Sequence, residues 1–448
     1  MVRDREMLAQ RIKEAFYIAR SGKPGPVLVD LPTDVMAELG STSYPTEVNI
    51  RGYKPNKGVH VGQLKKAITL LEEAKKPMFL IGGGVNLAHA QQEMTKLAEK
   101  IDAPVITTVM GRGAISTEHP LYIGNIGMHG SYAANKTADE CDLMFSIGCR
   151  FNDRVTGEIK KFAPNAKIVH IDIESAAISR NVTVDIPIVA DAKAAILKIL
   201  EHTEPMEHKE WLDEIQGWDK EYPLQMEVKD GVNPQRIIET LNEVYADRDT
   251  VFTSDVGQHQ MWASQYLKLD ATHRLVQSGG LGTMGFGLPS AVGAQIGCPE
   301  KSIVSISGDG GFQMNMQELA TAVCQELPLV NIVFNNNRLG MVRQMQELFF
   351  KKRYTITCLR YHKSCKGKCG TPGWVCPEYV PDFVKMAEAY GTKGYFVTED
   401  EQLRDTILEA RDYAEKNKKP VIVECMVAPD ELVMPMIKGG ASFEDIML

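Results

Sequence analysis

Two polar motifs, each placed where an apolar run ends, carry the clearest chemistry in the chain. Residues 308–311 (Gly-Asp-Gly-Gly) and residues 335–337 (Asn-Asn-Asn) each follow a strand-like run, and residues 314–325 between them have helical apolar spacing. The pattern predicts a strand–helix–strand unit whose two polar loops meet at one edge of a parallel sheet. The Asp309 carboxylate and the Asn336 amide, 27 positions apart, suit Mg2+, which takes its remaining ligands from phosphate and water. Either motif alone could be an ordinary turn or loop, but together they favour a metal–diphosphate site whose glycine N–H groups approach the phosphate.

This pair of motifs resembles the diphosphate–Mg2+ motif of thiamine-diphosphate enzymes. The surrounding sequence is similar, more narrowly, to the large subunit of acetolactate synthase (acetohydroxyacid synthase). The resemblance runs from about residue 5 to the C-terminus, with one insert, and is carried by residues 127–130, 151–157, 278–289, 336–344 and 346–349. It implies decarboxylation of pyruvate and condensation with a second 2-keto acid, pyruvate or 2-ketobutyrate. The products are 2-acetolactate or 2-aceto-2-hydroxybutyrate, in the first common step of branched-chain amino acid biosynthesis.

The resemblance also assigns roles in the C-terminal part of the chain. The thiamine diphosphate contacts it implies are Gly257, Gln258, His259, Gly282, Met284, Gly308, Asp309, Gly310, Gly311, Asn336, Gly340 and Met341. Mg2+ would bind Asp309, Asn336 and the main-chain oxygen of Arg338. Met284 would support the bent cofactor, Gln258 would act near the diphosphate, and Arg154 would face the carboxylate of the acceptor. Met284 could instead be a core residue, and Arg154 an ordinary surface charge.

The composition limits the classes of protein to which the chain can belong. The chain has 448 residues, of which 44% are hydrophobic and 24% charged, which is enough for two or three domains with cores of their own. The net charge of −8 and the lack of a basic block argue against nucleic acid as a partner. No apolar run has the length of a membrane helix and Met1 begins no signal peptide, so we expect a cytoplasmic protein. Nine cysteines are too few and too scattered for a disulfide scaffold.

The order of apolar runs predicts an α/β fold with two doubly wound parallel sheets. The central domain is expected at 58–202, with strands at 78–81, 105–109, 143–147 and 168–171, and the thiamine-diphosphate domain at 232–448. Residues 1–40 carry one helix (6–20) and one strand (26–32), which cannot bury a core alone. By resemblance they are the remnant of an N-terminal pyrimidine-binding domain, joined to the rest by a linker at 41–57.

By resemblance the central domain holds FAD. The residues that would line the flavin are Lys23, Gly82, Gly83, Met128, His129, Arg150, Asp172 and Asp191. Other interpretations stay open, because the glycines at 82–84 could form only a turn. Asp172 could cap the next helix and His129 could be structural. Lys23 stands where the family usually has an arginine, so it keeps the charge and loses the planar fork.

Two departures from the family concern the active site. The glutamate that activates thiamine diphosphate lies, in the family, before the stretch that resembles residues 5–35, and no residue here takes that role. The chain is therefore expected to be part of a longer protein or to work with a separate N-terminal domain chain. Met345 replaces a tryptophan that shapes the acceptor pocket, which should loosen the preference for 2-ketobutyrate. The family also implies a homo-oligomer (dimer or tetramer) and a small regulatory subunit.

The third departure is a cysteine-rich insert at 358–380. It holds Cys358, Cys365, Cys369 and Cys376, with His362 among them. Four thiolates could bind zinc or an iron–sulfur cluster. The insert lacks a Cys-x-x-Cys pair, however, and the alternative is a lysine-rich surface loop.

Rival functions come from two classes. Pyruvate oxidase, glyoxylate carboligase and flavin-free acetolactate synthase share the thiamine motif, but the segments 150–157 and 336–349 favour the biosynthetic, flavin-containing type. The other alternative is an inactive fragment that binds cofactors and needs an N-terminal domain in trans.

Overall fold

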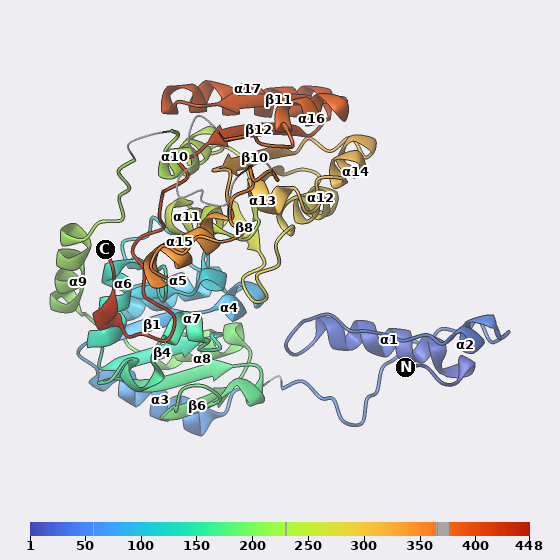
Figure 1. The fold of residues 1–448 in the computed structure, drawn as a ribbon. Helices are drawn as coiled ribbons and strands as arrows, with labels where there is room; N and C mark the ends of the chain where they lie inside the picture. The colour runs from blue at the N-terminus through green and yellow to red at the C-terminus, as the bar shows by residue number, and fades with distance from the viewer. Residues whose placement is uncertain (57, 229–230, 364, 366–375) are drawn as a thin grey trace.

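Two parallel sheets and a protruding N-terminal segment make up the fold (Figure 1). The computed structural model describes residues 1–56, 58–228, 231–363, 365 and 376–448. Each sheet has six strands, and every pairing in them is parallel. The predicted α/β class with two doubly wound sheets is confirmed.

The sheet of the central domain has the strand order β3-β2-β1-β4-β5-β6. Its strands are β1 (Pro77–Ile81), β2 (Val105–Thr107), β3 (Tyr122–Asn125), β4 (Leu143–Ile147), β5 (Lys167–Asp172) and β6 (Ile186–Val189). Its helices are α3 (Val61–Glu73), α4 (Gly83–Leu87), α5 (Gln91–Ile101), α6 (Tyr132–Glu140), α7 (Asp153–Thr156), α8 (Ala192–His202) and α9 (Lys209–Glu221). Side chains alternate across β1: Phe79 packs with α3, α5 and α8, whereas Met78 packs on the other face with α6 and α9.

The sheet of the C-terminal domain has the order β11-β12-β10-β9-β7-β8. Its strands are β7 (Thr250–Ser254), β8 (His273–Gln277), β9 (Ser302–Gly308), β10 (Val330–Asn335), β11 (Lys393–Val397) and β12 (Val421–Met426). Its helices are α10 (Pro234–Val244), α11 (Gln258–Tyr266), α12 (Gly287–Gly297), α13 (Asp309–Phe312), α14 (Glu318–Cys324), α15 (Gly340–Phe349), α16 (Phe383–Ala389) and α17 (Leu403–Asn417). Because β9 and β10 are parallel neighbours, the loops after them open at the same sheet edge, as predicted.

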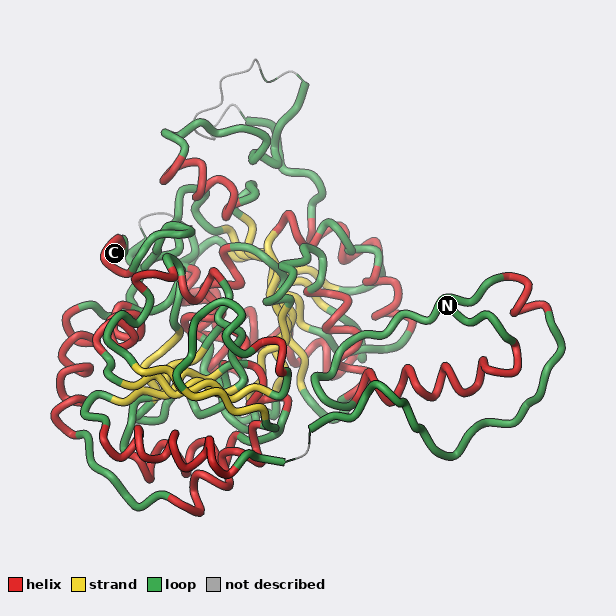
Figure 2. The backbone as a smooth tube through the Cα atoms, turned by 90° about the horizontal axis from the view of Figure 1, so that it is seen from below, coloured by secondary structure: helices red, strands yellow, loops and turns green. Residues whose placement is uncertain are grey.

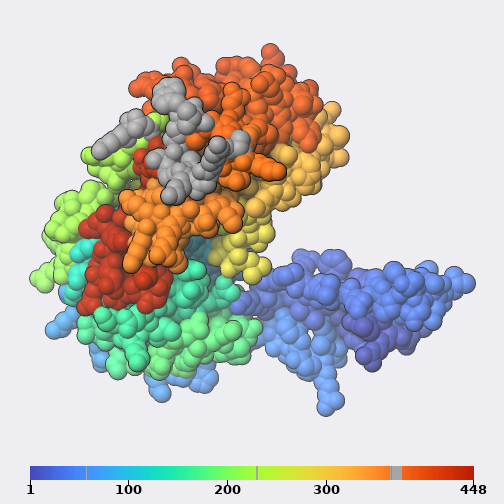
Figure 3. All heavy atoms as spheres, in the orientation of Figure 1, coloured from blue at the N-terminus to red at the C-terminus, as the bar shows by residue number. Residues whose placement is uncertain are grey.

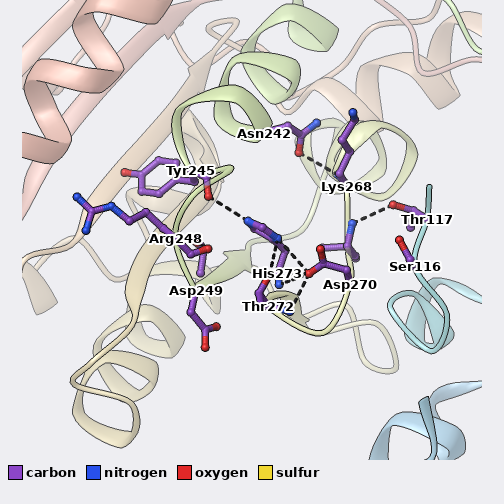
Figure 4. A network of polar contacts seen from close by, with 12 residues as sticks. Ser116, Thr117, Asn242, Tyr245, Arg248, Asp249, Lys268, Asp270, Thr272 and His273 are labelled. Atoms are coloured by element: carbon purple, nitrogen blue, oxygen red, sulfur yellow. Dashed lines mark hydrogen bonds and ion pairs between the residues drawn. The ribbon is translucent and has the colours of Figure 1, made fainter. Parts of the chain in front are cut away.

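Polar contacts lock the two domains together. Leu269 and Thr117 exchange two hydrogen bonds of 2.9 Å, from Thr117 N to Leu269 O and from Leu269 N to Thr117 Oγ1, at the junction drawn in Figure 4. The buried Arg112 guanidinium, from the central domain, donates to the main-chain oxygens of Ser264 and Leu267 at the end of α11. These bonds fix α11, whose other end faces the cofactor cavity described below.

Residues 1–56 form an arm that stands out from the two domains (Figures 2 and 3). It holds α1 (Leu8–Arg20) and α2 (Thr33–Ala37), and its end is tied to β6 by a bond of 2.6 Å from Asn56 Nδ2 to the Val189 oxygen. The strand expected at 26–32 does not form, because a strand needs a neighbouring strand and the arm offers none. Its Leu28 is 91% exposed.

None of the helices that the structure describes is long and apolar enough to cross a membrane.

Candidate cofactor and active site

A cavity of about 1640 Å3 lies where the arm, the central domain and the C-terminal domain meet. With one exception, all the site residues expected from the sequence line it. The central domain and the arm supply Lys23, Gly83, Met128, His129, Arg150, Arg154, Asp172 and Asp191. The C-terminal domain supplies Gly257, Gln258, His259, Gly282, Met284, Gly308, Asp309, Gly310, Gly311, Asn336, Arg338, Gly340 and Met341.

Asp309 follows β9 and is a buried carboxyl without a cationic partner. Its side chain is 2% exposed; Oδ1 accepts from Gly310 N at 2.8 Å, and Oδ2 has no hydrogen-bond partner in the described part of the chain. Burial raises the pKa of this carboxyl to about 8, although nearby backbone N–H groups lower it in part. A buried, unsatisfied oxygen at the end of a strand therefore fits a cation.

The loop after β10 forms the other side of the proposed metal site. We call Asp309, Asn336 and the main-chain oxygen of Arg338 the metal clamp. Asn336 Oδ1 accepts from Arg338 N at 3.1 Å, and Asn336 Nδ2 donates to Gln258 Oε1 at 3.2 Å. Asn335 Oδ1 accepts from Asn337 N at 2.9 Å and holds Asn337 in a left-handed conformation with φ 58°. In the described part of the chain no three His, Cys, Asp or Glu side chains gather as a metal site. One carboxylate with amide and main-chain oxygens matches Mg2+ that is completed by phosphate and water.

The start of α11 brings a buried histidine to the same cavity. His259 is 5% exposed, and its Nε2 has no hydrogen-bond partner within the residues that the structure describes. Burial lowers the pKa of the imidazole to about 4, outweighing the nearby Asp255, which raises it. A Cβ placed on Gly308 would lie 2.8 Å from His259 Nδ1, so the ring packs directly against the residue before Asp309. A neutral imidazole next to a helix N-terminus can hydrogen-bond an anion such as a diphosphate.

Met284 lies on the glycine-rich loop that precedes α12, with its side chain close to Gly310 beside the metal clamp. Gly282 and Gly285 on either side have φ of 64° and 86°, so the loop needs residues without a Cβ. A Cβ on Gly310 would lie 3.9 Å from Met284 Cε. Met284 is only half-buried and belongs to no hydrophobic core cluster, which disfavours the core-packing interpretation.

The central domain lines the other half of the cavity. Asp172 Oδ1 accepts from Glu174 N at 2.8 Å, and Asp191 caps α8 by accepting from Ala194 N at 3.0 Å, so both carboxylates also have local structural roles. His129 is half-buried, its buried Nδ1 has no hydrogen-bond partner among the described residues, and desolvation lowers the pKa of its imidazole to about 4. Lys23 reaches the cavity from the arm, as expected.

Gly82 is the exception among the predicted residues. It does not line the cavity, because it packs against the backbone of the neighbouring strand end. A Cβ there would lie 2.1 Å from the Gly148 oxygen. The close approach of β1 and β4 explains this glycine.

Arg154 lies at the rim of the cavity. Its side chain is 64% exposed, and its ion pair with Asp153 spans 3.7 Å. The C-terminal tail passes close by, since a Cβ on Gly439 would lie 3.5 Å from Arg154 Nη1. The guanidinium is thus available to a ligand in the cavity, where Met345 is also a lining residue.

Sequence reasoning missed two residues that organise the site. Asp255 directly follows β7 and accepts three backbone N–H groups, including those of Gly285 and Gly287. A carboxylate at a strand end is the same signal that identified Asp309. Met110 lines the cavity from the central domain, and a Cβ on Gly279 would lie 2.3 Å from its Sδ. Nothing in the sequence around Met110 indicated this contact.

The metal site predicted in the cysteine-rich insert falls largely outside the described residues. Cys369 is not described, and neither is most of the segment that joins it to Cys365 and Cys376. Among the described residues, Cys358 and Cys365 form no disulfide. The zinc or iron–sulfur hypothesis therefore stays a prediction.

Comparison with protein families defines the class of the protein. Residues 64–199 match the family described as "Thiamine pyrophosphate enzyme, central domain", and residues 255–425 match "Thiamine pyrophosphate enzyme, C-terminal TPP binding domain". The chain is thus a thiamine-pyrophosphate-dependent enzyme by both of its domains.

Individual relatives narrow the class. The acetolactate synthase large subunit of Corynebacterium glutamicum is 40% identical, over 100% of this chain and 70% of that protein. The acetolactate synthase isozyme 3 large subunit of Escherichia coli is 39% identical, over 99% of this chain and 76% of that protein. The probable acetolactate synthase large subunit of Methanocaldococcus jannaschii is 40% identical, over 99% and 73%. The chain belongs to the family of acetolactate synthase large subunits.

Proposed function

We propose that this chain holds thiamine diphosphate through Mg2+ and takes part in the synthesis of 2-acetolactate from pyruvate. The observation that carries the proposal is the buried Asp309 Oδ2, which has no hydrogen-bond partner among the described residues and belongs to a side chain that lines the cavity together with Asn336. Asp309, Asn336 and the Arg338 carbonyl would hold the metal. His259 and the glycine N–H groups would contact the diphosphate.

The cofactor, when bound, supplies a carbon nucleophile that attacks a 2-keto acid and releases CO2. The residues of the chain position the reactants. Met284 would support the cofactor above Gly310. Arg154, at the rim, would bind the carboxylate of the acceptor keto acid, a task that suits its planar fork. Met345 is thinner than the tryptophan expected in the family, so we propose that pyruvate competes well with 2-ketobutyrate as acceptor.

FAD is proposed for the central half of the cavity. Gly83 starts α4 after β1, His129 has an unpaired ring nitrogen, and Lys23 and Arg150 bring positive charge to the same space. These features fit a dinucleotide with a negatively charged pyrophosphate.

The cavity as described lacks one feature of a complete active site. Its acidic side chains, among the described lining residues, are Asp172, Asp191 and Asp309, and no glutamate is among them. This observation favours the alternative in which the chain binds its cofactors but needs an N-terminal domain for turnover. The arm supports that alternative, because Phe16 and Leu39 are 64% and 100% exposed. A homo-oligomer and a smaller second subunit, which the name "large subunit" of the relatives suggests, are part of the same proposal.

The test is turnover by the purified chain. Protein is incubated with pyruvate, thiamine diphosphate, Mg2+ and FAD, and acetolactate is measured after conversion to acetoin. Asp309→Ala is the inactive control. Acetolactate from wild type alone supports synthase activity of the chain. Cofactor binding without acetolactate selects the alternative, and a chain that binds no thiamine diphosphate refutes both.

A further inference from the structure

Asp255, at the carboxyl end of β7, is a buried carboxylate to which the proposed function assigns no task. Its side chain is 1% exposed, and it lies one residue outside the strand that pairs with β9. We propose that Asp255 is a positioning residue that fixes the Met284 loop at a set distance from the metal clamp. The inference rests on the proposed function, because it concerns how the same cavity holds thiamine diphosphate.

The Asp255 carboxylate binds the Met284 loop through hydrogen bonds from backbone N–H groups. Asp255 Oδ1 accepts from Val256 N at 2.7 Å and from Gly285 N at 3.1 Å, and Oδ2 accepts from Gly287 N at 2.9 Å. Gly285 immediately follows Met284. Both oxygens of one buried anion are thus satisfied by backbone donors, the arrangement in which a carboxylate makes its strongest hydrogen bonds.

The carbonyl groups of Gly285 and Gly287 also accept hydrogen bonds from side chains. Asn315 Nδ2 donates to the Gly285 oxygen at 2.7 Å, and Thr253 Oγ1 donates to the Gly287 oxygen at 3.0 Å. A Cβ on Gly285 would lie 2.6 Å from Asn315 Nδ2, so the loop has no room to shift in that direction. The N–H and C=O groups of Gly285 and Gly287 are therefore fixed by the side chains of Thr253 in β7, of Asp255 just after it and of Asn315 before α14.

Asp255 touches the metal-binding segment as well. A Cβ on Gly311 would lie 2.4 Å from Asp255 Oδ1, and one on Gly310 would lie 3.9 Å from Met284 Cε. One carboxylate therefore contacts the loop that carries Met284 and the helix α13 that begins at Asp309. It sets the spacing between the apolar support and the metal ligand, which a bent cofactor must span.

An amide of the same shape separates positioning from folding. In Asp255→Asn one oxygen becomes an NH2 group that faces a backbone N–H, so at least one of the two loop contacts is lost. The rest of the site, including His259 and the Asn336 loop, keeps its own contacts. Asp270→Asn is the matched control: Asp270 also accepts backbone N–H groups, from Thr272 and His273 (Figure 4), but it is not among the described residues that line the cavity.

The experiment compares two ligands of the full chain in the presence of Mg2+. Thiamine diphosphate needs both the clamp and the Met284 loop, whereas inorganic pyrophosphate needs only the clamp. We expect Asp255→Asn to weaken the binding of thiamine diphosphate by about tenfold and to leave the affinity for pyrophosphate within about twofold of wild type. Asn315→Ala, which frees the other side of Gly285, should act in the same direction. Asp270→Asn should change neither affinity.

A double-mutant cycle with Met284→Ala provides the second readout. If Asp255 acts through Met284, the double variant should bind thiamine diphosphate no more weakly than Met284→Ala alone. Additive losses, unchanged thiamine diphosphate affinity in Asp255→Asn, or equal losses for both ligands would overturn the inference. Failure of wild type to bind either ligand is a different result: it refutes the proposed function, and the inference with it.

Discussion

Replacement of His259 by glutamine should change how the stability of the cofactor-free protein depends on pH. The pKa of this buried imidazole is lowered from 6.5 to about 4 by burial, so the unfolded chain binds a proton more readily than the folded one. The histidine therefore contributes stability that is complete above pH 6.5 and is lost as the pH falls towards 4. Each pKa unit corresponds to about 1.4 kcal/mol, so the whole loss amounts to about 3 kcal/mol.

The assay is urea unfolding of wild type and His259→Gln between pH 4.5 and pH 7.5, without cofactor. The quantity of interest is the difference in unfolding free energy between the two proteins, because it cancels the other titrating groups, His129 included. This difference should shift in favour of the variant as the pH falls below 6.5. His202→Gln, at an exposed residue of α8, should run parallel to wild type. Parallel curves for His259→Gln would refute the interpretation that His259 is buried and neutral.

Three further substitutions test other parts of the account. Arg112→Met removes the donor of two interdomain hydrogen bonds and should lower the unfolding free energy by about 2 kcal/mol. Arg112→Lys should restore part of the loss. Unchanged urea midpoints would contradict the role of these buried hydrogen bonds. Gly82→Ala places a Cβ 2.1 Å from the Gly148 oxygen and should cost about 1–3 kcal/mol by the same measurement, whereas Gly217→Ala, with nothing within 4 Å, should not destabilise. Arg154→Gln should raise the KM for pyruvate about tenfold or more and leave thiamine diphosphate affinity unchanged; a change in cofactor affinity instead would move Arg154 out of its proposed role.

Interior strands could be predicted from the sequence, and most edge strands could not. The largely apolar runs of β1, β4 and β10 are buried on both faces and stand out in the sequence. By contrast β3, β6 and β8 lie at sheet edges, and β8 alternates exposed and half-buried residues such as Arg274 and Leu275. The run at 26–32 shows the converse error. Its composition favours a strand, but a strand forms only where another strand pairs with it.

The candidate site divides in the same way. Asp309 and Asn336 were predictable because both end strands that parallel pairing brings to one edge. The helix between them was placed too early, since α14 begins at Glu318 after the short helix α13. Contacts between the domains could not be predicted from the sequence. The buried hydrogen bonds of Arg112 join a loop after β2 to α11, and no local sequence pattern indicates a contact between residues so far apart in the chain.

The central claim is that Asp309 and Asn336 hold thiamine diphosphate through a divalent cation. Calorimetric titration of the purified chain with thiamine diphosphate, once with Mg2+ and once with EDTA, tests it directly. We predict saturable one-to-one binding with Mg2+, its loss in EDTA, and its loss in Asp309→Ala at equal Mg2+. Binding that is unchanged by EDTA, or that Asp309→Ala retains in full, would contradict the account.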